Sequence, residues 1–161
     1  MKSIVVYYSL EENTRWAAEK IAEAIGADLL RIEPVKPYLN KGAAKFIKGG
    51  RSAMMGEKPK LKSYEFNSDD YELIILGTPV WAGKPAPPIN TFVSENILKN
   101  KKLALLFCST GGDERKACMN LKKKVGITKD IPVASLIDPY KKQDFANTEK
   151  LKEFCQALTE E

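Results

Sequence analysis

The sequence contains no histidine, and its three cysteines form no C-x-x-C pair. Without histidine, the chain lacks the usual general base near neutral pH, the Ser-His and Cys-His dyads, and the commonest metal ligand. An odd number of widely spaced cysteines does not indicate a disulfide-dense scaffold. Any redox or acid-base chemistry must therefore come from elsewhere, and a bound cofactor is its simplest source. We accordingly predict no catalytic side chain and no metal site.

Long apolar runs and targeting signals are also missing. The longest apolar runs are too short to span a bilayer. A single Lys precedes the first strand-like run, so the N-terminus lacks the basic region, the long apolar segment and the cleavage site of a signal peptide. We therefore expect a cytoplasmic protein that does not attach to a membrane.

Length and charge set further bounds. The chain has 161 residues, enough for one domain with a core beneath a sheet, and we expect a single domain over residues 1–161. Lys and Arg number 26 against 21 Asp and Glu, which gives a net charge of +5. This excess supports solubility or an acidic partner, and alone it does not indicate nucleic acid.

Short β-branched runs alternate with helical patterns along the chain. Runs such as Ile4-Val5-Val6 are apolar on consecutive residues, as expected where helices cover both faces of a parallel sheet. The pattern predicts a three-layer α/β/α sandwich. Its expected strands span residues 3–8, 28–33, 71–77, 102–107 and 132–137, and its expected helices span residues 14–25, 86–99, about 113–124 and about 147–158.

Residues 34–67 interrupt this alternation. The segment contains three prolines and the pair Gly49-Gly50, and we predict a short helix that begins near Ala43 and ends before the glycine pair. Connections this long in a compact domain are often binding loops. A flexible crossover without ligand contacts is the alternative.

The first candidate binding loop, Ser9 to Thr14, follows an apolar strand and opens a helix. Exposed backbone N–H groups and the positive end of a helix dipole meet at such a turn, and Ser9, Asn13 and Thr14 add side-chain donors that suit a phosphate monoester. The loop contains neither G-x-x-x-x-G-K-[ST] nor G-x-G-x-x-G. A ligand simpler than a nucleoside triphosphate or a dinucleotide is therefore favoured.

This loop also has a purely structural interpretation. Asn13 and Thr14 can simply cap the helix, as Asn and Thr often do at such positions. Glu11 and Glu12 fit beside a phosphate only if their carboxylates face solvent, and Arg15 would then offset part of their charge.

The second candidate loop, residues 78–84, places Trp81 at the end of a strand among prolines and glycines. An indole in this position is suited to stacking on a flat ligand, although it can also cap the core or belong to a protein interface. Gly83 has no Cβ, so its backbone can approach a ring closely.

The third candidate loop, residues 109–113, consists mainly of small residues whose amides can line the edge of a heteroaromatic ring. Its alternative is an ordinary helix start with Asp113 as the cap. The adjacent Cys108 invites a nucleophile hypothesis. With no histidine to form a thiolate pair, a buried small hydrophobic residue is the favoured interpretation.

With these three loops in order, the chain resembles the flavodoxin family, above all in the sequence G-T-P-V-W-A-G at residues 77–83. The resemblance covers nearly the whole chain. It implies a five-stranded parallel sheet of order 2-1-3-4-5 that binds FMN outside the carboxyl ends of its strands, an arrangement of which flavodoxin is a standard example. The chain departs from the family in Glu11 and Glu12, in the lack of an aromatic residue in the third loop, and in its basic net charge.

The resemblance also implies the residues that contact the cofactor. Glu11 and Glu12 would contribute main chain, and Trp81 would stack on the flavin. The implied set is Ser9, Glu11, Glu12, Asn13 and Thr14 at the phosphate, Thr78, Pro79, Val80, Trp81, Ala82 and Gly83 at the flavin, and Ser109, Thr110, Gly111, Gly112 and Asp113 along its pyrimidine side.

Two functions follow from the resemblance. The favoured one is an electron carrier that docks with redox partner proteins around the flavin. The alternative is an FMN-dependent NAD(P)H:quinone-type oxidoreductase that reduces a small-molecule electron acceptor, with Tyr38, Phe46 and Arg51 shaping a substrate pocket. For Phe46, a packing role within a helix is the favoured interpretation. A flavodoxin-like module without flavin is a third possibility. A phospho-acceptor receiver domain is disfavoured because it needs acidic residues where this chain has Tyr7-Tyr8-Ser9.

Overall fold

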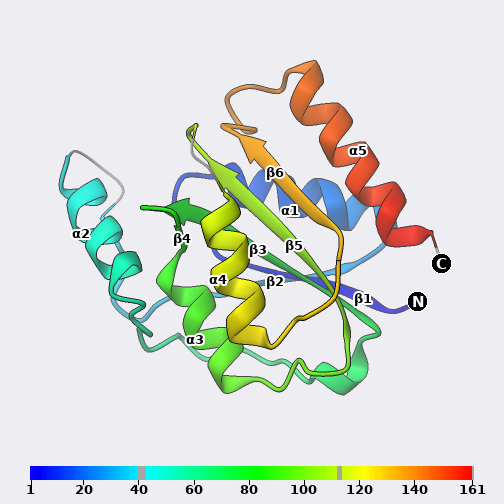
Figure 1. The fold of residues 1–161 in the computed structure, drawn as a ribbon, viewed down its shortest axis with the longest axis horizontal. Helices are drawn as coiled ribbons and strands as arrows, with labels where there is room; N and C mark the ends of the chain where they lie inside the picture. The colour runs from blue at the N-terminus through cyan, green and yellow to red at the C-terminus, as the bar shows by residue number, and fades with distance from the viewer. Residues whose placement is uncertain (40–42, 112–113, 161) are drawn as a thin grey trace.

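The centre of the molecule is a parallel sheet (Figure 1). The computed structural model describes residues 1–39, 43–111 and 114–160, with residues 43–47 described by their backbone alone. Within these residues the strands lie in the order β2-β1-β3-β5-β6, and the short β4 pairs with the end of β3. The predicted order 2-1-3-4-5 is therefore confirmed, because β4 is only the second arm of a hairpin. The strands are β1 (Ser3–Tyr7), β2 (Asp28–Arg31), β3 (Leu73–Trp81), β4 (Lys84–Pro85), β5 (Lys102–Ser109) and β6 (Val133–Ile137).

Helices cover both faces of the sheet, so the predicted three-layer sandwich is confirmed (Figure 1). None of the helices in the described part of the chain is long and apolar enough to cross a membrane. One face holds α1 (Asn13–Ile25) and α5 (Phe145–Thr159), and the other holds α3 (Pro87–Glu95) and α4 (Arg115–Val125). The helix α2 (Ala43–Met54) lies beside β3 and β4. A 3-10 turn spans Ser68–Asp70.

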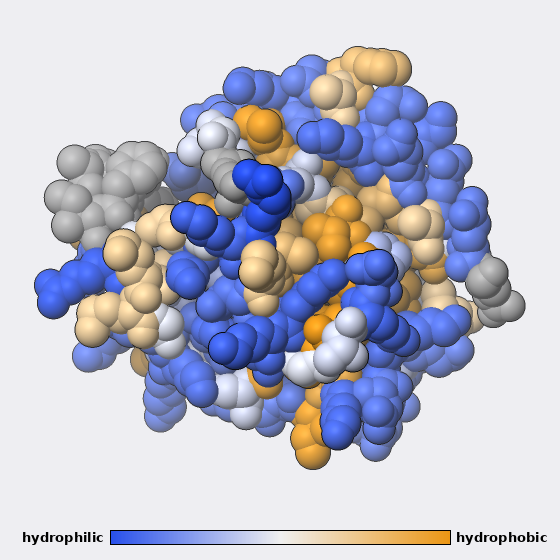
Figure 2. Space-filling model, in the orientation of Figure 1, coloured by the Kyte–Doolittle hydropathy of each residue, from blue (hydrophilic) through white to orange (hydrophobic). Residues whose placement is uncertain are grey.

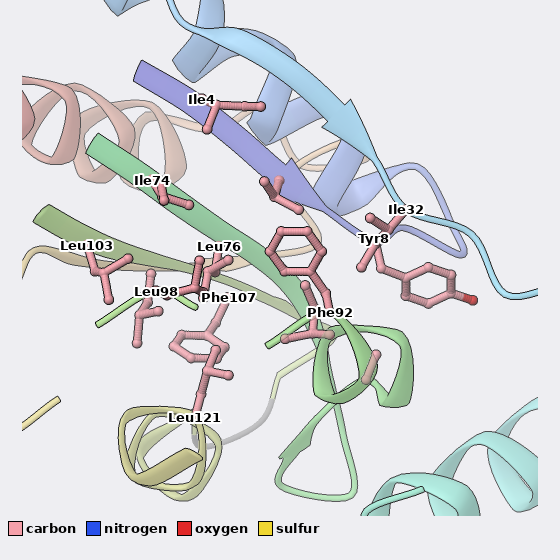
Figure 3. Close-up of a cluster of buried hydrophobic side chains, with 14 of the residues drawn as sticks. Ile4, Tyr8, Ile32, Ile74, Leu76, Phe92, Leu98, Leu103, Phe107 and Leu121 are labelled. Atoms are coloured by element: carbon pink, nitrogen blue, oxygen red, sulfur yellow. The ribbon is translucent and has the colours of Figure 1, made fainter. Parts of the chain in front are cut away.

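A hydrophobic core lies on each side of the sheet, because successive residues of each strand point to opposite faces. On the side of α3 and α4, Ile4, Ile74 and Leu103 pack with Phe92 and Leu121, as Figure 3 shows. On the other side, the neighbouring strand residues Val5, Ile75 and Ala104 pack with Ile21 and Phe154. Burial on both faces explains why these strands are apolar at every position.

Three predicted boundaries were wrong by more than two residues. β3 does not stop at Gly77 but continues to Trp81, because its last residues pair with β4. The α2 helix does not end before Gly49-Gly50 but runs through the pair to Met54. The helix α3 ends at Glu95 rather than near residue 99, because the Asn96 side chain donates a hydrogen bond to the carbonyl of Phe92 (2.9 Å) and caps it.

Candidate functional site

A cavity of about 430 Å³ lies at the carboxyl ends of β1, β3 and β5. The ends of neighbouring parallel strands meet at one edge of the sheet, so the three predicted loops converge there. α2 adds a fourth wall. The residues that line the cavity are Ser9, Leu10, Glu11, Asn13, Thr14, Gly50, Pro79, Val80, Trp81, Ala82, Gly83, Cys108, Ser109, Thr110 and Gly111.

Twelve of these residues belong to the set implied by the family resemblance. The structure does not bring Glu12 or Thr78 to the cavity wall. Gly112 and Asp113, and the Phe46 side chain, lie outside the described residues. Three lining residues were not in the implied set. Leu10 and Cys108 are neighbours in sequence of predicted loop residues. Gly50 belongs to α2, and no sequence motif indicates that this helix contributes to the cavity wall.

Ser9 and Asn13 use their side chains to hold the backbone around the start of α1. The Ser9 hydroxyl oxygen accepts a hydrogen bond from the Arg15 N–H (3.2 Å), which is a capping contact. The Asn13 carboxamide oxygen accepts one from the Tyr140 N–H (3.0 Å), and its nitrogen donates to Asp138 Oδ1 (3.5 Å). Asn13 therefore ties α1 to the loop after β6, and main-chain N–H groups remain the principal donors of this turn.

Thr14 is the exception among the three predicted donors. It is buried and lines the cavity, and within the described part of the chain its hydroxyl has no oxygen or nitrogen partner, only the Cys108 thiol, a weak acceptor, beside it. A buried hydroxyl without a partner costs about 1–3 kcal/mol. A ligand oxygen in the cavity would remove this cost, so Thr14 is the side chain in the first loop that most directly indicates a ligand.

Gly77 allows α1 to begin this close to the sheet. A Cβ at Gly77 would lie 3.0 Å from Tyr7 Cβ and 3.3 Å from Thr14 Cγ2. Only a residue without a side chain fits between strand β1 and the first turn of α1. Gly77 therefore sets the position of Thr14 at the cavity wall.

Glu12 has an unusual backbone conformation for its type. Its φ of +67° lies in the left-handed region that favours glycine, immediately before α1. Its carboxylate pairs with the Arg15 guanidinium at 3.0 Å, and its side chain remains 42% exposed. The carboxylate is thus held at the surface by Arg15, while the Glu12 backbone shapes the turn into the helix.

Glu12→Gly is expected to stabilise the fold slightly. Glycine removes a left-handed strain of about 1–2 kcal/mol and adds about 0.5–1 kcal/mol of unfolded-state entropy, so the net gain is up to about 1 kcal/mol. Urea denaturation measures this change. Glu12→Ala is the matched control, because it removes the same carboxylate and keeps the strain. An equal gain in both variants would contradict the backbone explanation.

The second loop is a tight hairpin. Val80 pairs with Pro85 and Trp81 with Lys84, and the two turn residues Ala82 and Gly83 have φ of +50° and +71°. Positive φ at both positions is the type I′ geometry whose twist matches that of the flanking strands. The turn therefore presents the Ala82-Gly83 backbone, with little side chain, to the cavity.

Thr78 stabilises the base of this hairpin. It is fully buried, and its hydroxyl accepts a hydrogen bond from the Ala86 N–H (3.0 Å) and donates one to the carbonyl of Pro79 (2.9 Å). These internal bonds explain why Thr78 does not reach the cavity wall. Thr78 positions Pro79 and the residues that follow it.

The Trp81 indole is fixed by an aromatic cluster. It meets the rings of Tyr8 and Tyr38 edge-on, with centroids 5.7 Å and 5.1 Å away. A Cβ on Gly49 would lie 3.3 Å from Trp81 Cε3, so α2 packs its backbone against the indole. Trp81 thus both contacts the core and lines the cavity. It combines the core-capping role and the ligand-facing position that were considered for it from the sequence.

Cys108 lies at the cavity but is not a reactive thiolate. Burial, the larger effect, raises the pKa of its thiol to about 12, and the neighbouring Thr14 hydroxyl lowers it in part. A thiol with this pKa stays protonated near neutral pH. The interpretation of Cys108 as a small hydrophobic residue agrees with this environment.

The protonated Cys108 makes stability depend on pH in the alkaline range. From the ordinary thiol pKa of 9.0 up to about 12, the unfolded chain loses this proton and the folded chain keeps it. The free energy of unfolding should therefore fall by about 1.4 kcal/mol per pH unit from this group above pH 9 and be unaffected by it below. Urea denaturation of wild type and Cys108→Ala should give diverging pH curves in that range, and parallel curves would contradict the assignment.

The chemistry of the cavity fits an organic phosphate that carries a flat ring. The first loop offers helix N-terminal N–H groups and the Thr14 hydroxyl, while Trp81 and the Ala82-Gly83 turn offer an apolar wall with backbone polar groups. The described residues contain no cluster of His, Cys, Asp or Glu that could hold a metal ion. The site is thus built for a bound organic group.

Residues 2–151 match the sequence model of the flavodoxin family. The chain belongs to the flavodoxin family. This membership covers all three cavity loops, so the expected recognition is confirmed. FMN is the cofactor of that family, and the donors and the flat wall of this flavodoxin-family cavity are of the kinds that FMN requires. A comparison with curated proteins gives no match.

Solved structures agree with this flavodoxin-family fold. A protein assigned as a flavoprotein from Bacteroides eggerthii DSM 20697 is 24% identical, with 99% of each chain covered and a TM-score of 0.75. A flavoprotein from Lactobacillus acidophilus NCFM, solved in complex with FMN, is 23% identical over 87% of this chain and 95% of its own, with a TM-score of 0.69. A flavodoxin from the domain Archaea is 20% identical over 98% of this chain and 93% of its own, with a TM-score of 0.57.

Proposed function

We propose that this flavodoxin-family protein binds FMN in the cavity and acts as an electron carrier in the cytoplasm. The observation that supports the proposal most is that the buried Thr14 hydroxyl at the start of α1, in the wall of a cavity lined by Trp81, has no oxygen or nitrogen partner among the described residues. Bound FMN supplies one- and two-electron redox chemistry. The protein's own task is then to hold, orient and shield the cofactor.

Each wall has a distinct role in this proposal. The N–H groups of residues 10–14 and the Thr14 hydroxyl would hold the phosphate. Trp81 would contact one face of the ring, and the Ala82-Gly83 turn would approach its edge. Ser109, Thr110 and Gly111 would line the pyrimidine side, and we keep Gly112 and Asp113 as expectations beyond the described residues. Glu12 and Thr78 would act indirectly, by shaping the backbone of their loops.

Two protic side chains at or behind the cavity wall, those of Cys108 and Tyr8, are not suited to moving a proton near neutral pH. The Cys108 thiol has a pKa of about 12. Burial, the largest effect, raises the pKa of Tyr8, which packs behind Trp81. These groups stay neutral, so the chain provides binding and a defined electrostatic environment. This agrees with a carrier, whose chemistry resides in its cofactor.

The packing of residues 34–67 supports the carrier over the reductase. Tyr38, a predicted substrate-pocket residue, packs against Trp81. Its hydroxyl forms a hydrogen bond with the Ser52 hydroxyl (3.0 Å). Arg51 is exposed and does not line the cavity. The NAD(P)H:quinone-type oxidoreductase is the alternative, and its support is that α2 contributes Gly50 to the cavity wall.

Cofactor binding and nicotinamide oxidation together test the proposal. The protein is titrated with FMN, and quenching of flavin fluorescence gives the dissociation constant. The FMN-loaded protein is then mixed anaerobically with NADH or NADPH in a stopped-flow spectrometer, with free FMN as the control. Saturable binding with nicotinamide oxidation no faster than that of free FMN supports the carrier. Saturable turnover with nicotinamide contradicts the carrier in favour of the reductase, and absence of FMN binding contradicts both.

A further inference from the structure

The charges of this chain are segregated along its sequence. Residues 34–64, 73–94 and 115–129 contain 15 of the 26 Lys and Arg residues, but only one of the 21 Asp and Glu residues. The remaining residues contain 11 basic and 20 acidic side chains. The net charge of +5 is therefore the sum of a strongly basic group of segments and an acidic remainder.

The basic segments lie together in the fold. α2 contacts β3 and β4, α4 packs against β4, and α3 packs against α4. This face is turned to the viewer in Figure 1, and in Figure 2 most of its surface is hydrophilic. The face also adjoins the cavity, because the β3–β4 hairpin belongs to both.

Five lysines define what we call the lysine surface: Lys58, Lys84, Lys116, Lys123 and Lys124. None of them has a carboxylate oxygen within 4.0 Å among the residues that the structure describes. Lys124 instead donates a hydrogen bond to Asn90 Oδ1 (2.6 Å). Within the described part of the chain, the surface is thus an array of positive charges that no carboxylate neutralises by direct contact.

Contacts place this array beside the opening of the cavity. The Lys116 Cδ would lie 3.8 Å from a Cβ on Gly83, so its aliphatic stem runs along the cavity hairpin. Lys124 Nζ would lie 3.9 Å from a Cβ on Gly56, just beyond α2. Lys84 is part of β4 itself. The lysine surface therefore extends from the Gly83 edge of the cavity across α4 to the end of α2.

The lysines also repel one another. Burial, the largest effect, lowers the pKa of Lys124, and the charges of Lys58 and Lys84 lower it further. Like charges held this close raise the free energy of the unbound protein. An anionic partner would relieve that repulsion as it binds.

Building on the proposed electron-carrier function, we propose that an acidic redox protein docks on the lysine surface, with its redox centre facing the Ala82-Gly83 edge of the cavity. Complementary charge steers such encounters and fixes their orientation. Docking there would bring the partner to the hairpin that lines the cavity. The sign of this interaction follows from the lysine surface, which borders the cavity at Gly83.

Exposed methionines favour a protein over other polyanions. Met54, Met55 and Met119 are 69%, 65% and 72% exposed, and they belong to α2, the residue after it, and α4. Methionine is enriched in protein interfaces, where its flexible side chain adapts to different contacts. A surface that mixes lysines with exposed thioethers is suited to a protein partner, whereas a nucleic acid would use the lysines alone.

Binding of charged redox proteins tests the proposal. The acidic probe is a strongly negative [2Fe–2S] ferredoxin, and the basic probe is cytochrome c. Affinities are measured by biolayer interferometry for the whole chain, with and without FMN, at about 20 mM and about 200 mM NaCl, between which screening changes strongly. The test variant is K116E/K123E/K124E. The control K20E/K150E/K152E makes the same change in net charge on α1 and α5.

We expect wild type to bind the ferredoxin and not cytochrome c, with affinity falling as salt rises. The test variant should bind at least about tenfold more weakly, while the control variant stays within about threefold of wild type. Equal losses in both variants would mean that net charge, and not this surface, governs binding, and would overturn the proposal. Preference for cytochrome c, or binding only to single-stranded DNA or to phosphatidylserine vesicles, would also overturn it.

The same preparations separate this proposal from the proposed function. FMN affinity is measured for every variant, and it should stay within about twofold of wild type because none of the substituted lysines lines the cavity. Ferredoxin binding without FMN binding would support the lysine surface and contradict the electron carrier. FMN binding without ferredoxin binding would contradict the lysine surface alone.

Discussion

Gly77→Val is expected to lower the free energy of unfolding by about 3 kcal/mol, the upper part of the range for overpacking a core. A Cβ at this position would lie 3.0 Å from Tyr7 Cβ and 3.3 Å from Thr14 Cγ2. Tyr7 belongs to the adjacent strand β1 and cannot move without disturbing the centre of the sheet. α1 would therefore shift, and the cavity wall that contains Thr14 would shift with it. Urea denaturation and FMN titration measure the two effects.

A second glycine provides the matched control for crowding. Gly126 ends α4 with a φ of +79°, and a Cβ there would meet no atom within 4 Å. Gly126→Ala should cost about 1–2 kcal/mol through its backbone alone and leave FMN affinity unchanged. If Gly77→Val proved no more damaging than Gly126→Ala, the close approach of α1 to β3 would not be important for the site.

Thr14→Val is expected to weaken FMN binding by roughly 10- to 100-fold, because a hydrogen bond to a charged group contributes about 1.5–3 kcal/mol. The same change should leave the stability of the FMN-free protein unchanged or raise it by up to about 1 kcal/mol, because it removes a buried hydroxyl that, among the described residues, has no oxygen or nitrogen partner. Opposite signs for binding and stability distinguish a ligand contact from a packing role. Fluorescence titration and urea denaturation of the FMN-free protein measure them.

Thr91→Val is the natural control for this substitution. Thr91 is also buried, but its hydroxyl donates a hydrogen bond to the carbonyl of Pro59 (2.7 Å). Its loss should reduce stability by about 1–3 kcal/mol and leave FMN affinity unchanged. A loss of stability in Thr14→Val with unaltered FMN affinity would contradict the proposed role of Thr14.

The layers could be predicted from local patterns in the sequence, whereas the strand order was implied by the resemblance to the flavodoxin family. Apolar runs such as Leu73-Ile74-Ile75-Leu76 require burial on both faces, and alternating strands and helices require a parallel sheet. The three candidate loops follow three of these strands, so their convergence at one edge also followed from the predicted order. The layers depend on periodicity, which a single sequence displays, while the convergence of the loops depends on the order that the family resemblance implies.

The hydrogen-bond partners of side chains could not be predicted from the sequence. Asn13 looked equally suited to a phosphate and to a helix cap, and the structure pairs it with Asp138 and Tyr140, more than a hundred residues away. Thr78 looked like a ligand contact until its hydroxyl was found within the base of the hairpin. Such choices depend on contacts between distant segments, to which local composition is insensitive.

Glycine gave the most misleading local signal. The pair Gly49-Gly50 predicts the end of a helix, because glycine lowers the stability of a helix interior. The pair instead lies inside α2, where the missing side chains allow contact with Trp81 and Ala82. The same physical property, the lack of a Cβ, explains both the prediction and its failure.

The glycine pair has a consequence for how the molecule opens. Two interior glycines lower the intrinsic helix stability of α2 by about 2 kcal/mol relative to alanine, so α2 depends on its contact with the indole of Trp81. Its amides should therefore exchange with deuterium through partial unfolding, at a lower free energy than those of β1 and β3. A ligand that fixes Trp81 would slow that exchange. The exchange rate of the α2 amides would then report whether the cavity is occupied.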